Sequence, residues 1–284
     1  MSSIDLHCHT SMSDGALSPT EVVNRAVERN LTHLAITDHD CISGIAEAKD
    51  AAMDRIEIIP GSELSTTFNN TQIHIVGLFL NPECSALKDY IDGQLQRRIE
   101  RAVRIGQKLE KAGFANAYER TKEQAAEGAI ITRGNYARFI FSQGKASSVD
   151  DAFNCYLKKG KFAYVNTIWP DIAEAVGVIH SAGGVAVLAH PRRYTLTNTK
   201  LRALLEYFRN CGGEAIEVAS CQQRPCDREY LSSLCEKYGF MASCGSDFHY
   251  IGTWRDLGMH IDLPSNVKPV WLSPKAEAFN FPQL

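Results

Sequence analysis

The sequence predicts an α/β fold in which a single barrel forms most of the chain. Short apolar segments alternate with amphipathic ones, which is typical of strands joined by helices in βαβ units. The chain has 284 residues, 44% of them hydrophobic, and this is enough to bury one large core. From about Ser85 to Leu157, however, the pattern is almost entirely helical and rich in charge. We therefore expect a mostly parallel barrel that is interrupted by a helical insertion.

Seven segments are predicted to be the strands of this barrel. In chain order they are SIDLH, HLAITD, IEIIPGSEL, QIHIVGLFL, GGVAVLAHP, EAIEVAS and MASCGSDFH. One helix pattern between them has Pro19 in its first turn, and another runs over residues 171–180. On this basis residues 1–84 and 158–284 form the barrel that carries the site, and residues 85–157 form an insertion that covers it.

Composition and charge exclude several classes of protein. The formal net charge of −3 argues against a protein that coats duplex phosphates, because such binding needs a broad basic face. The nine cysteines are scattered without a C-x-x-C pair, which argues against a disulfide framework and a structural zinc knuckle. The longest apolar stretch, AVGVIHSAGGVAVLAHP, is broken by a histidine and paired glycines, so no membrane span is expected. We expect a cytoplasmic protein, and no protein partner is evident.

Side chains able to bind metal follow most of the predicted strands. The members of this set are His7, His9, Asp14, His39, Glu63, His74, His190, Asp247 and His249. The carboxyl ends of parallel strands meet at one rim of a barrel, so these residues are expected to form one cluster there. So many imidazoles and carboxylates would repel one another or change protonation unless divalent cations bound between them. The other histidines, His33, His180 and His260, are expected to be structural.

Each member of the set also has an ordinary structural explanation. An aspartate at a strand end is commonly a helix N-cap, and a lone buried histidine usually bonds to the backbone. A metal role is least supported for His74, which lies within the apolar segment QIHIV. The recurrence of such residues at six strand ends nevertheless favours a metal centre for the set as a whole.

Six motifs give the chain a resemblance to a known family. HCHTSMSDG, AITDHD, GSEL, IHIVG, AHP and GSDFH, in this order, resemble the polymerase and histidinol phosphatase (PHP) superfamily of metal-dependent phosphoesterases. SDGALSP, LAITDHD and GGVAVLAHP are most similar to its TrpH-like branch, which contains nucleoside 3',5'-bisphosphate phosphatases and related 5'-to-3' exoribonucleases. The resemblance implies a distorted seven-stranded (β/α)7 barrel. It also implies three divalent metal ions, manganese in the first place and iron or zinc as alternatives.

The resemblance further implies a role for each residue of the set. The first ion would be bound by His7, His9, Glu63 and Asp247, the second by Glu63, His74 and His190, and the third by Asp14, His39 and His249. Asp14, His39 and His249 are also the candidate catalytic residues, and Asp14 and His39 would contact the substrate. The implied reaction removes the 3'-phosphate from nucleoside 3',5'-bisphosphates to give 5'-mononucleotides. Stepwise release of 5'-mononucleotides from short 5'-phosphorylated RNA is the second implied activity.

A bisphosphate or a 5'-phosphorylated RNA end needs a second anion site. Arginines are the natural candidates, because a guanidinium binds phosphate through two parallel hydrogen bonds. Arg97, Arg101 and Arg104 share one face of the helix predicted over QLQRRIERAVRIGQKL. Composition alone equally allows a solvated face that is paired with Glu100 and Glu110.

The segment TRGNYARF supplies the other candidates for substrate binding. Related proteins place an R-x-x-R helix and a T-R segment over the site, which favours Arg101, Arg104 and Arg133. This chain departs from many relatives because Gly134 and Asn135 replace a Pro-His pair. Gly134 would allow a backbone N–H to approach a phosphate, and Asn135 would hydrogen-bond a phosphate or sugar.

Two other functions fit the same motifs. One is a different small-molecule phosphatase, such as a histidinol phosphatase. The other is a PHP module that binds metal or a partner without catalysis, against which the complete ligand set argues. The motifs do not determine the physiological metal, the base preference, the proton donor to the leaving group or the oligomeric state. They also leave open whether mononucleotides or oligonucleotides are the main substrate.

Overall fold

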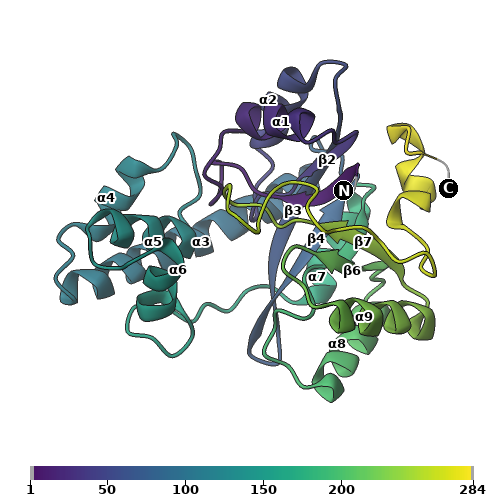
Figure 1. The fold of residues 1–284 in the computed structure, drawn as a ribbon. Helices are drawn as coiled ribbons and strands as arrows, with labels where there is room; N and C mark the ends of the chain where they lie inside the picture. Colours follow the sequence, from purple (N-terminus) through teal and green to yellow (C-terminus); the bar gives the residue numbers. More distant parts are fainter. Residues whose placement is uncertain (1–2, 283–284) are drawn as a thin grey trace.

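Seven strands form one nearly closed barrel, which confirms the predicted fold class (Figure 1). The computed structural model of the chain describes residues 3–282. The strands follow the chain order: β1 Ile4–Cys8, β2 His33–Ile36, β3 Glu57–Phe68, β4 Thr71–Leu78, β5 Val185–Leu188, β6 Ala215–Ser220 and β7 Met241–Gly245. The barrel closes between β7 and β1, where the N–H of Asp247 donates to the carbonyl of His7 at 2.8 Å and Cys8 pairs with Phe248.

One strand of the barrel runs against its neighbours. β1, β2 and β3 are parallel, as are β5, β6 and β7, but β4 is antiparallel to both β3 and β5. The reversal takes place at Asn69 and Asn70, whose φ angles are 45° and 59°. Two positive φ angles in a two-residue hairpin loop define a type I′ turn, and asparagine tolerates this conformation. The β3–β4 unit is therefore a hairpin rather than a strand–helix–strand unit.

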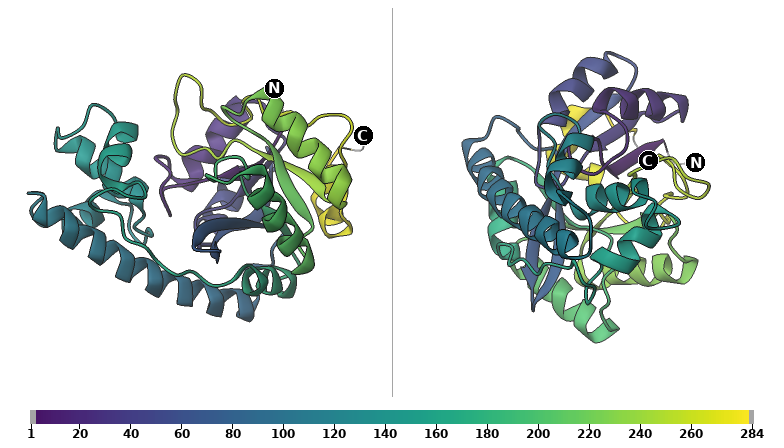
Figure 2. Two further views of the ribbon diagram at one scale, coloured as in Figure 1. Left: turned by 90° about the horizontal axis from the view of Figure 1, so that it is seen from below. Right: turned by 90° about the vertical axis from the view of Figure 1, so that its left-hand side faces the viewer.

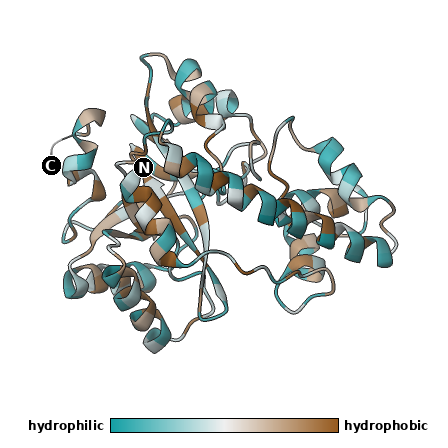
Figure 3. Ribbon diagram, turned by 180° about the vertical axis from the view of Figure 1, so that it is seen from behind, coloured by the Kyte–Doolittle hydropathy of each residue, from teal (hydrophilic) through white to brown (hydrophobic). Residues whose placement is uncertain are grey.

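Five helices cover the outside of the barrel (Figure 1). They are α1 Pro19–Glu28, α2 Gly44–Ala52, α7 Ile172–Ser181, α8 Asn198–Asn210 and α9 Pro225–Tyr238. Two of them begin at capping boxes, with Ser18 and Asp171 as the N-cap residues, because these side chains accept hydrogen bonds from otherwise unpaired N–H groups. The start that Pro19 predicts is thus confirmed. In Figure 3 the strands are largely hydrophobic, whereas the outer helices carry many hydrophilic positions.

Residues 85–157 are helical, as the sequence predicts. They form α3 Ser85–Lys111, α4 Ala117–Gln124, α5 Arg133–Ser142, α6 Val149–Ala152 and a π-helical turn at Phe153–Leu157. Figure 2 shows α3 running away from the barrel, with the shorter helices gathered at its far end. These helices have a hydrophobic core of their own around Tyr136, Phe139 and Ile140. The division of the chain into 1–84 with 158–284 and 85–157 stays a prediction.

The remaining sequence expectations concern disulfide bonds and membrane-spanning helices. All nine cysteines are free thiols, in line with the absence of paired motifs. Within residues 3–282, no helix is long and apolar enough to cross a membrane. The C-terminal segment contains two 3-10 helices, Val270–Leu272 and Pro274–Phe279. His33 holds this segment, since its Nε2 lies 2.9 Å from the carbonyl oxygen of Phe279.

Candidate metal centre and active site

The predicted metal ligands form one cluster at a rim of the barrel, and the Glu63 carboxylate lies at its centre. Glu63 is fully buried. Its Oε1 lies 2.8 Å from Nδ1 of His74 and 2.9 Å from Nε2 of His190. Its Oε2 lies 2.7 Å from Nδ1 of His39 and 3.4 Å from Nε2 of His9. Residues from four separate parts of the chain thus meet at one carboxylate.

His74 reaches this cluster because β4 is reversed. In a parallel strand a residue must lie near the carboxyl end to reach the rim where the other strands end. In antiparallel β4 the first half of the strand lies there instead, and His74 pairs with Ser65 of β3. The sequence supports a metal role least for His74, because the apolar segment around it does not reveal that β4 is reversed.

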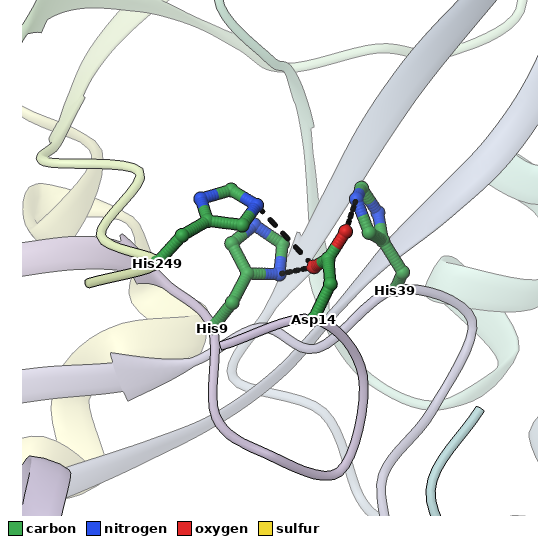
Figure 4. Close-up of side chains that lie close together, drawn as sticks. All are labelled: His9, Asp14, His39 and His249. Carbon is green, nitrogen blue, oxygen red and sulfur yellow. Dashed lines mark ion pairs between the residues drawn. The ribbon is translucent and has the colours of Figure 1, made fainter. Parts of the chain in front are cut away.

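Three overlapping groups within the cluster could each hold a cation. In each group one ligand atom per residue lies within 4.8 Å of all the others. The groups are His9 with Asp14, His39 and His249; His7 with His9 and Glu63; and His39 with Glu63 and His74. Figure 4 shows the first group, in which the Asp14 carboxylate points between the three imidazoles. Asp247 adjoins the second group, since its Oδ1 lies 3.0 Å from Nε2 of His9.

Several nitrogen and oxygen atoms of the cluster residues are buried without a hydrogen-bond partner. They are Nε2 of His7, Nδ1 of His9, Oδ1 of Asp14, Nδ1 of His39, Oε2 of Glu63 and Nδ1 of His190. An unsatisfied buried polar atom costs about 1–3 kcal/mol, so six at one place need an explanation. Imidazole nitrogens and carboxylate oxygens are the ligands that transition-metal ions and zinc prefer. The donor set therefore fits divalent cations.

The pKa values of the cluster residues depend on burial and on the close contacts between carboxylates and imidazoles. Burial opposes the charge on Glu63, but the imidazoles of His74 and His39 outweigh it and hold the pKa of this carboxyl well below its usual range. Burial lowers the pKa of His39 to about 4. For His249 burial acts in the same direction, but the carboxylate of Asp14 overcomes it and raises the pKa to about 9. Opposite charges thus compensate one another inside a buried site.

Glu217 is a part of the site that the sequence analysis missed. It lies on β6, is 3% exposed, and its Oε2 lies 2.9 Å from Nδ1 of His7. The same oxygen accepts the backbone N–H of His190 at 3.1 Å. The available signal was a glutamate in the middle of the apolar segment AIEVAS, which could have indicated an inward-facing carboxylate.

A pocket of about 500 Å³ opens onto the cluster and carries an excess of arginine. Its lining contains Asp14, His39, His74, His190, Asp247, His249, Arg98, Arg101, Arg133, Arg138, Arg193 and Arg255. Arg101 and Arg133 therefore lie at the predicted position. Arg104 does not line this pocket but an outer hollow with Arg97. Arg98 is not on the face that Arg97, Arg101 and Arg104 share by their spacing, but it lines the pocket together with Arg101.

The start of α5 is built around Asp14. The Thr132 hydroxyl donates to Oδ2 of Asp14 at 2.8 Å and accepts the N–H of Gly134 at 2.9 Å. A Cβ at position 134 would lie 3.0 Å from both Cβ and Oδ2 of Asp14, so glycine permits this close approach. The Gly134 N–H is thus used within the helix cap, while Gly134 also lines the pocket, and its approach to a phosphate stays a prediction.

Asn135 has a structural task at the start of α5. Its Oδ1 accepts the backbone N–H of Thr132 at 2.8 Å, which completes the capping box of α5. Its Nδ2 donates to the carbonyl of Ser13 at 3.3 Å. The side chain is 7% exposed and does not line the pocket that opens onto the cluster. A contact of Asn135 with phosphate or sugar stays a prediction.

Curated proteins of similar sequence cover nearly the whole chain. The family model described as PHP domain matches residues 5–83. A 5'-3' exoribonuclease of Haemophilus influenzae is 44% identical over 268 residues, which cover 94% of this chain and 97% of that protein. The 5'-3' exoribonuclease Rnm of Escherichia coli is 44% identical over 270 residues, which cover 94% of this chain and 92% of that protein. A 3',5'-nucleoside bisphosphate phosphatase of Chromobacterium violaceum is 40% identical over 273 residues, with coverage of 95% and 96%.

Solved structures share the fold at similar coverage. An amidohydrolase of Chromobacterium violaceum, solved with bound sulfate and no metal, superposes with a TM-score of 0.90 at 39% identity and covers 95% of both chains. A protein of Bifidobacterium adolescentis assigned as a metal-dependent phosphoesterase superposes with a TM-score of 0.83 at 26% identity and covers 93% of both. With a metal-ligand cluster at the barrel rim and relatives of this similarity, the chain belongs to the PHP family of metal-dependent phosphoesterases.

Proposed function

We propose that this protein hydrolyses the 3'-phosphate of nucleoside 3',5'-bisphosphates to give 5'-mononucleotides and inorganic phosphate. We also propose that it releases 5'-mononucleotides stepwise from short 5'-phosphorylated RNA. One observation carries the proposal: the pocket combines the cluster around Glu63 with two arginines, Arg101 and Arg133, that have no carboxylate partner among the described residues. Such a pocket suits a substrate with two separate anionic groups. The names of the curated relatives support the same substrate class.

The nine ligands would hold three divalent ions, manganese in the first place. His7, His9, Glu63 and Asp247 would bind the first ion, Glu63, His74 and His190 the second, and Asp14, His39 and His249 the third. When bound, such ions supply Lewis-acid activation of water and offset the charge on the phosphoryl oxygens. The protein contributes a buried and prearranged ligand set, in which neighbouring imidazoles, and Arg193 beside Asp247, hold the pKa values of the carboxyl groups well below their usual range.

The chain's own groups orient the substrate between two anion sites. Asp14, His39 and His249 are the members of the cluster proposed to hold the third ion, and they also line the pocket. They would therefore adjoin the phosphoryl group that is cleaved. Arg101 and Arg133 would bind the second phosphate through charge-assisted hydrogen bonds. In the reaction an oxygen of water bonds to phosphorus while the bond from phosphorus to the 3'-oxygen breaks. The 3'-oxygen takes up a proton and leaves as the hydroxyl of the 5'-mononucleotide.

A substrate panel tests the proposal. The purified protein is stripped with a chelator, reloaded with Mn²⁺ and assayed for release of phosphate or mononucleotide. The substrates are a nucleoside 3',5'-bisphosphate, a 5'-phosphorylated RNA oligomer, histidinol phosphate and an aryl phosphate. We expect no turnover without metal and the highest kcat/KM on the bisphosphate. Full activity of the stripped protein, or a preference for histidinol phosphate, would contradict the proposal.

A further inference from the structure

Two arginines on α3 enter the pocket side by side, but only one has a compensating charge. Arg98 and Arg101 lie one helical turn apart and are 4% and 7% exposed. Arg98 donates from Nε to Oδ2 of Asp40 at 2.6 Å and from Nη2 to the hydroxyl of Ser65 at 2.9 Å. Asp40 is fully buried. The orientation of Arg98 is thus fixed by hydrogen bonds to the barrel.

Arg101 has no comparable anchor. Among residues 3–282 no carboxylate forms an ion pair with it, and its Nε is buried without a hydrogen-bond partner. Burial, together with the neighbouring charges of Arg133 and Arg98, lowers the pKa of this guanidinium well below its usual range. A guanidinium carries five donors and no acceptor, so without an acceptor nearby hydrogen bonds do not orient it.

The ring of Trp169 is the contact that Arg101 does have. The guanidinium carbon of Arg101 lies 5.5 Å from the ring centroid, and that of Arg98 lies 5.2 Å from it. Both distances are within the range of cation–π attraction, which is strongest for tryptophan. One ring therefore contacts the paired guanidinium and the unpaired one together.

Trp169 is itself anchored to the barrel. It is 3% exposed, and its backbone N–H donates to the hydroxyl of Thr67 on β3 at 3.0 Å. The N–H of Thr67 in turn donates to the carbonyl of Pro170 at 2.9 Å. The ring is thus a fixed surface on the barrel side, while the arginines come from the helical segment.

We infer that Trp169 is a positioning residue for the second anion site: its ring holds the Arg101 guanidinium at the pocket, ready for a phosphate of the substrate. This inference rests on the proposed function and deepens it. Trp169 then sets the discrimination between substrates with two phosphate groups and substrates with one. It does not touch the phosphate that is cleaved, since it does not line the pocket.

Two substitutions in the full-length protein separate positioning from packing. Trp169→Met fills much of the space with a flexible apolar side chain but removes the ring, and Trp169→Phe keeps a weaker ring. Trp254→Met is the matched control, because Trp254 is 70% exposed. KM and kcat are measured in Mn²⁺ on a nucleoside 3',5'-bisphosphate and on an aryl phosphate. Calorimetry gives the affinity of the metal-free protein for the bisphosphate, and thermal melting gives stability.

We expect Trp169→Met to raise KM for the bisphosphate and to weaken its binding by about tenfold, with kcat and the aryl phosphate kinetics unchanged. Trp169→Phe should lose less affinity than Trp169→Met, but a measurable part of it. Equal losses on both substrates, or no loss on either, would overturn the inference. If the wild type had the same kcat/KM on both substrates, the proposal of a second anion site would be wrong, and the inference with it. If the wild type prefers the bisphosphate and Trp169→Met keeps that preference, only the inference fails.

A double-mutant cycle covers the case in which Trp169→Met does not fold. Trp169→Phe is combined with Arg101→Ala, and the affinity of the metal-free protein for the bisphosphate is measured for all four proteins. The inference predicts that the penalty of Trp169→Phe disappears once Arg101 is alanine. A penalty of the same size in both backgrounds would show that Trp169 acts independently of Arg101 and would overturn the inference.

Discussion

Nδ1 of His7 lies 2.9 Å from Oε2 of Glu217, and this contact leaves Nε2 of the same ring facing the cluster. Nε2 lies 3.5 Å from Glu63 and 3.4 Å from Asp247. A carboxylate behind a ligating histidine fixes the ring orientation and makes the facing nitrogen a stronger ligand. Glu217 thus supports the metal centre from behind although it does not face the pocket.

Replacing this carboxylate should weaken metal binding. Glu217→Gln keeps the shape but removes the charge behind His7, so we expect the affinity for Mn²⁺ to fall by about 10- to 100-fold. Calorimetric titration of the stripped protein measures it, with the exposed Glu236→Gln as control. Unchanged affinity in Glu217→Gln would mean that the contact has only a packing role.

Arg101 and Arg133, two pocket arginines without a carboxylate partner among the described residues, should determine recognition of the second phosphate. Arg101→Ala and Arg133→Ala each remove charged donors from the pocket, so KM for a nucleoside 3',5'-bisphosphate should rise by roughly 10- to 100-fold. Hydrolysis of an aryl phosphate should change little. Arg104→Ala is the control, since Arg104 lies on the same helix outside this pocket. Equal losses on both substrates would remove the second-site proposal.

The absence of a side chain at position 134 should matter for activity. In Gly134→Ala the new Cβ would meet Asp14 at 3.0 Å, so either Asp14 or the start of α5 must move. We expect at least a tenfold loss of kcat/KM, because displacement of a ligand by even 1 Å is costly. Gly177→Ala in α7 is the control, since no atom lies within 4 Å of its added Cβ.

The control substitution Gly177→Ala should also raise the stability of the protein. Alanine is favoured over glycine within a helix by about 1 kcal/mol, so Gly177→Ala should raise the melting temperature and leave the kinetics unchanged. A fully active Gly134→Ala protein would show that the close approach of Gly134 to Asp14 is not required.

The ion pair between Arg98 and Asp40 should be important for stability. Both side chains are buried, so Arg98→Met leaves an unpaired carboxylate in the interior. We expect the free energy of unfolding to fall by about 3–5 kcal/mol, as measured by denaturant titration. The exposed pair of Lys88 and Glu83 supplies the comparison, and Lys88→Met should change stability little. A similarly small effect of Arg98→Met would indicate that Asp40 is satisfied by its other donors.

The clustering of the candidate metal ligands could be predicted from the sequence because it follows from one general property of parallel barrels. His7, His39, His190 and Asp247 are distant in sequence, but each comes near the end of a predicted strand, and strand ends share a rim. Glu217 could not be distinguished in this way, because one acidic residue in a buried strand has many explanations. Its role depends on which face of β6 turns inward, and strand alternation alone does not fix that face.

The arginine predictions show the corresponding difficulty for helices. Spacing places Arg97, Arg101 and Arg104 on one face of α3, but it does not tell which edge of that face meets the barrel. The structure turns Arg98 and Arg101 toward the pocket and leaves Arg104 outside it. Asn135 completes a capping box with Thr132, a task that the sequence pattern alone does not distinguish from a substrate contact.

Anomalous X-ray scattering from crystals loaded with Mn²⁺ tests the central claim most directly. We expect strong anomalous peaks around Glu63, three of them at full loading. Elemental analysis of the same protein should detect the bound Mn²⁺. The ligand atoms of the nine residues should lie at coordinating distances from these peaks. The absence of bound ions at this rim under every loading condition would contradict the account.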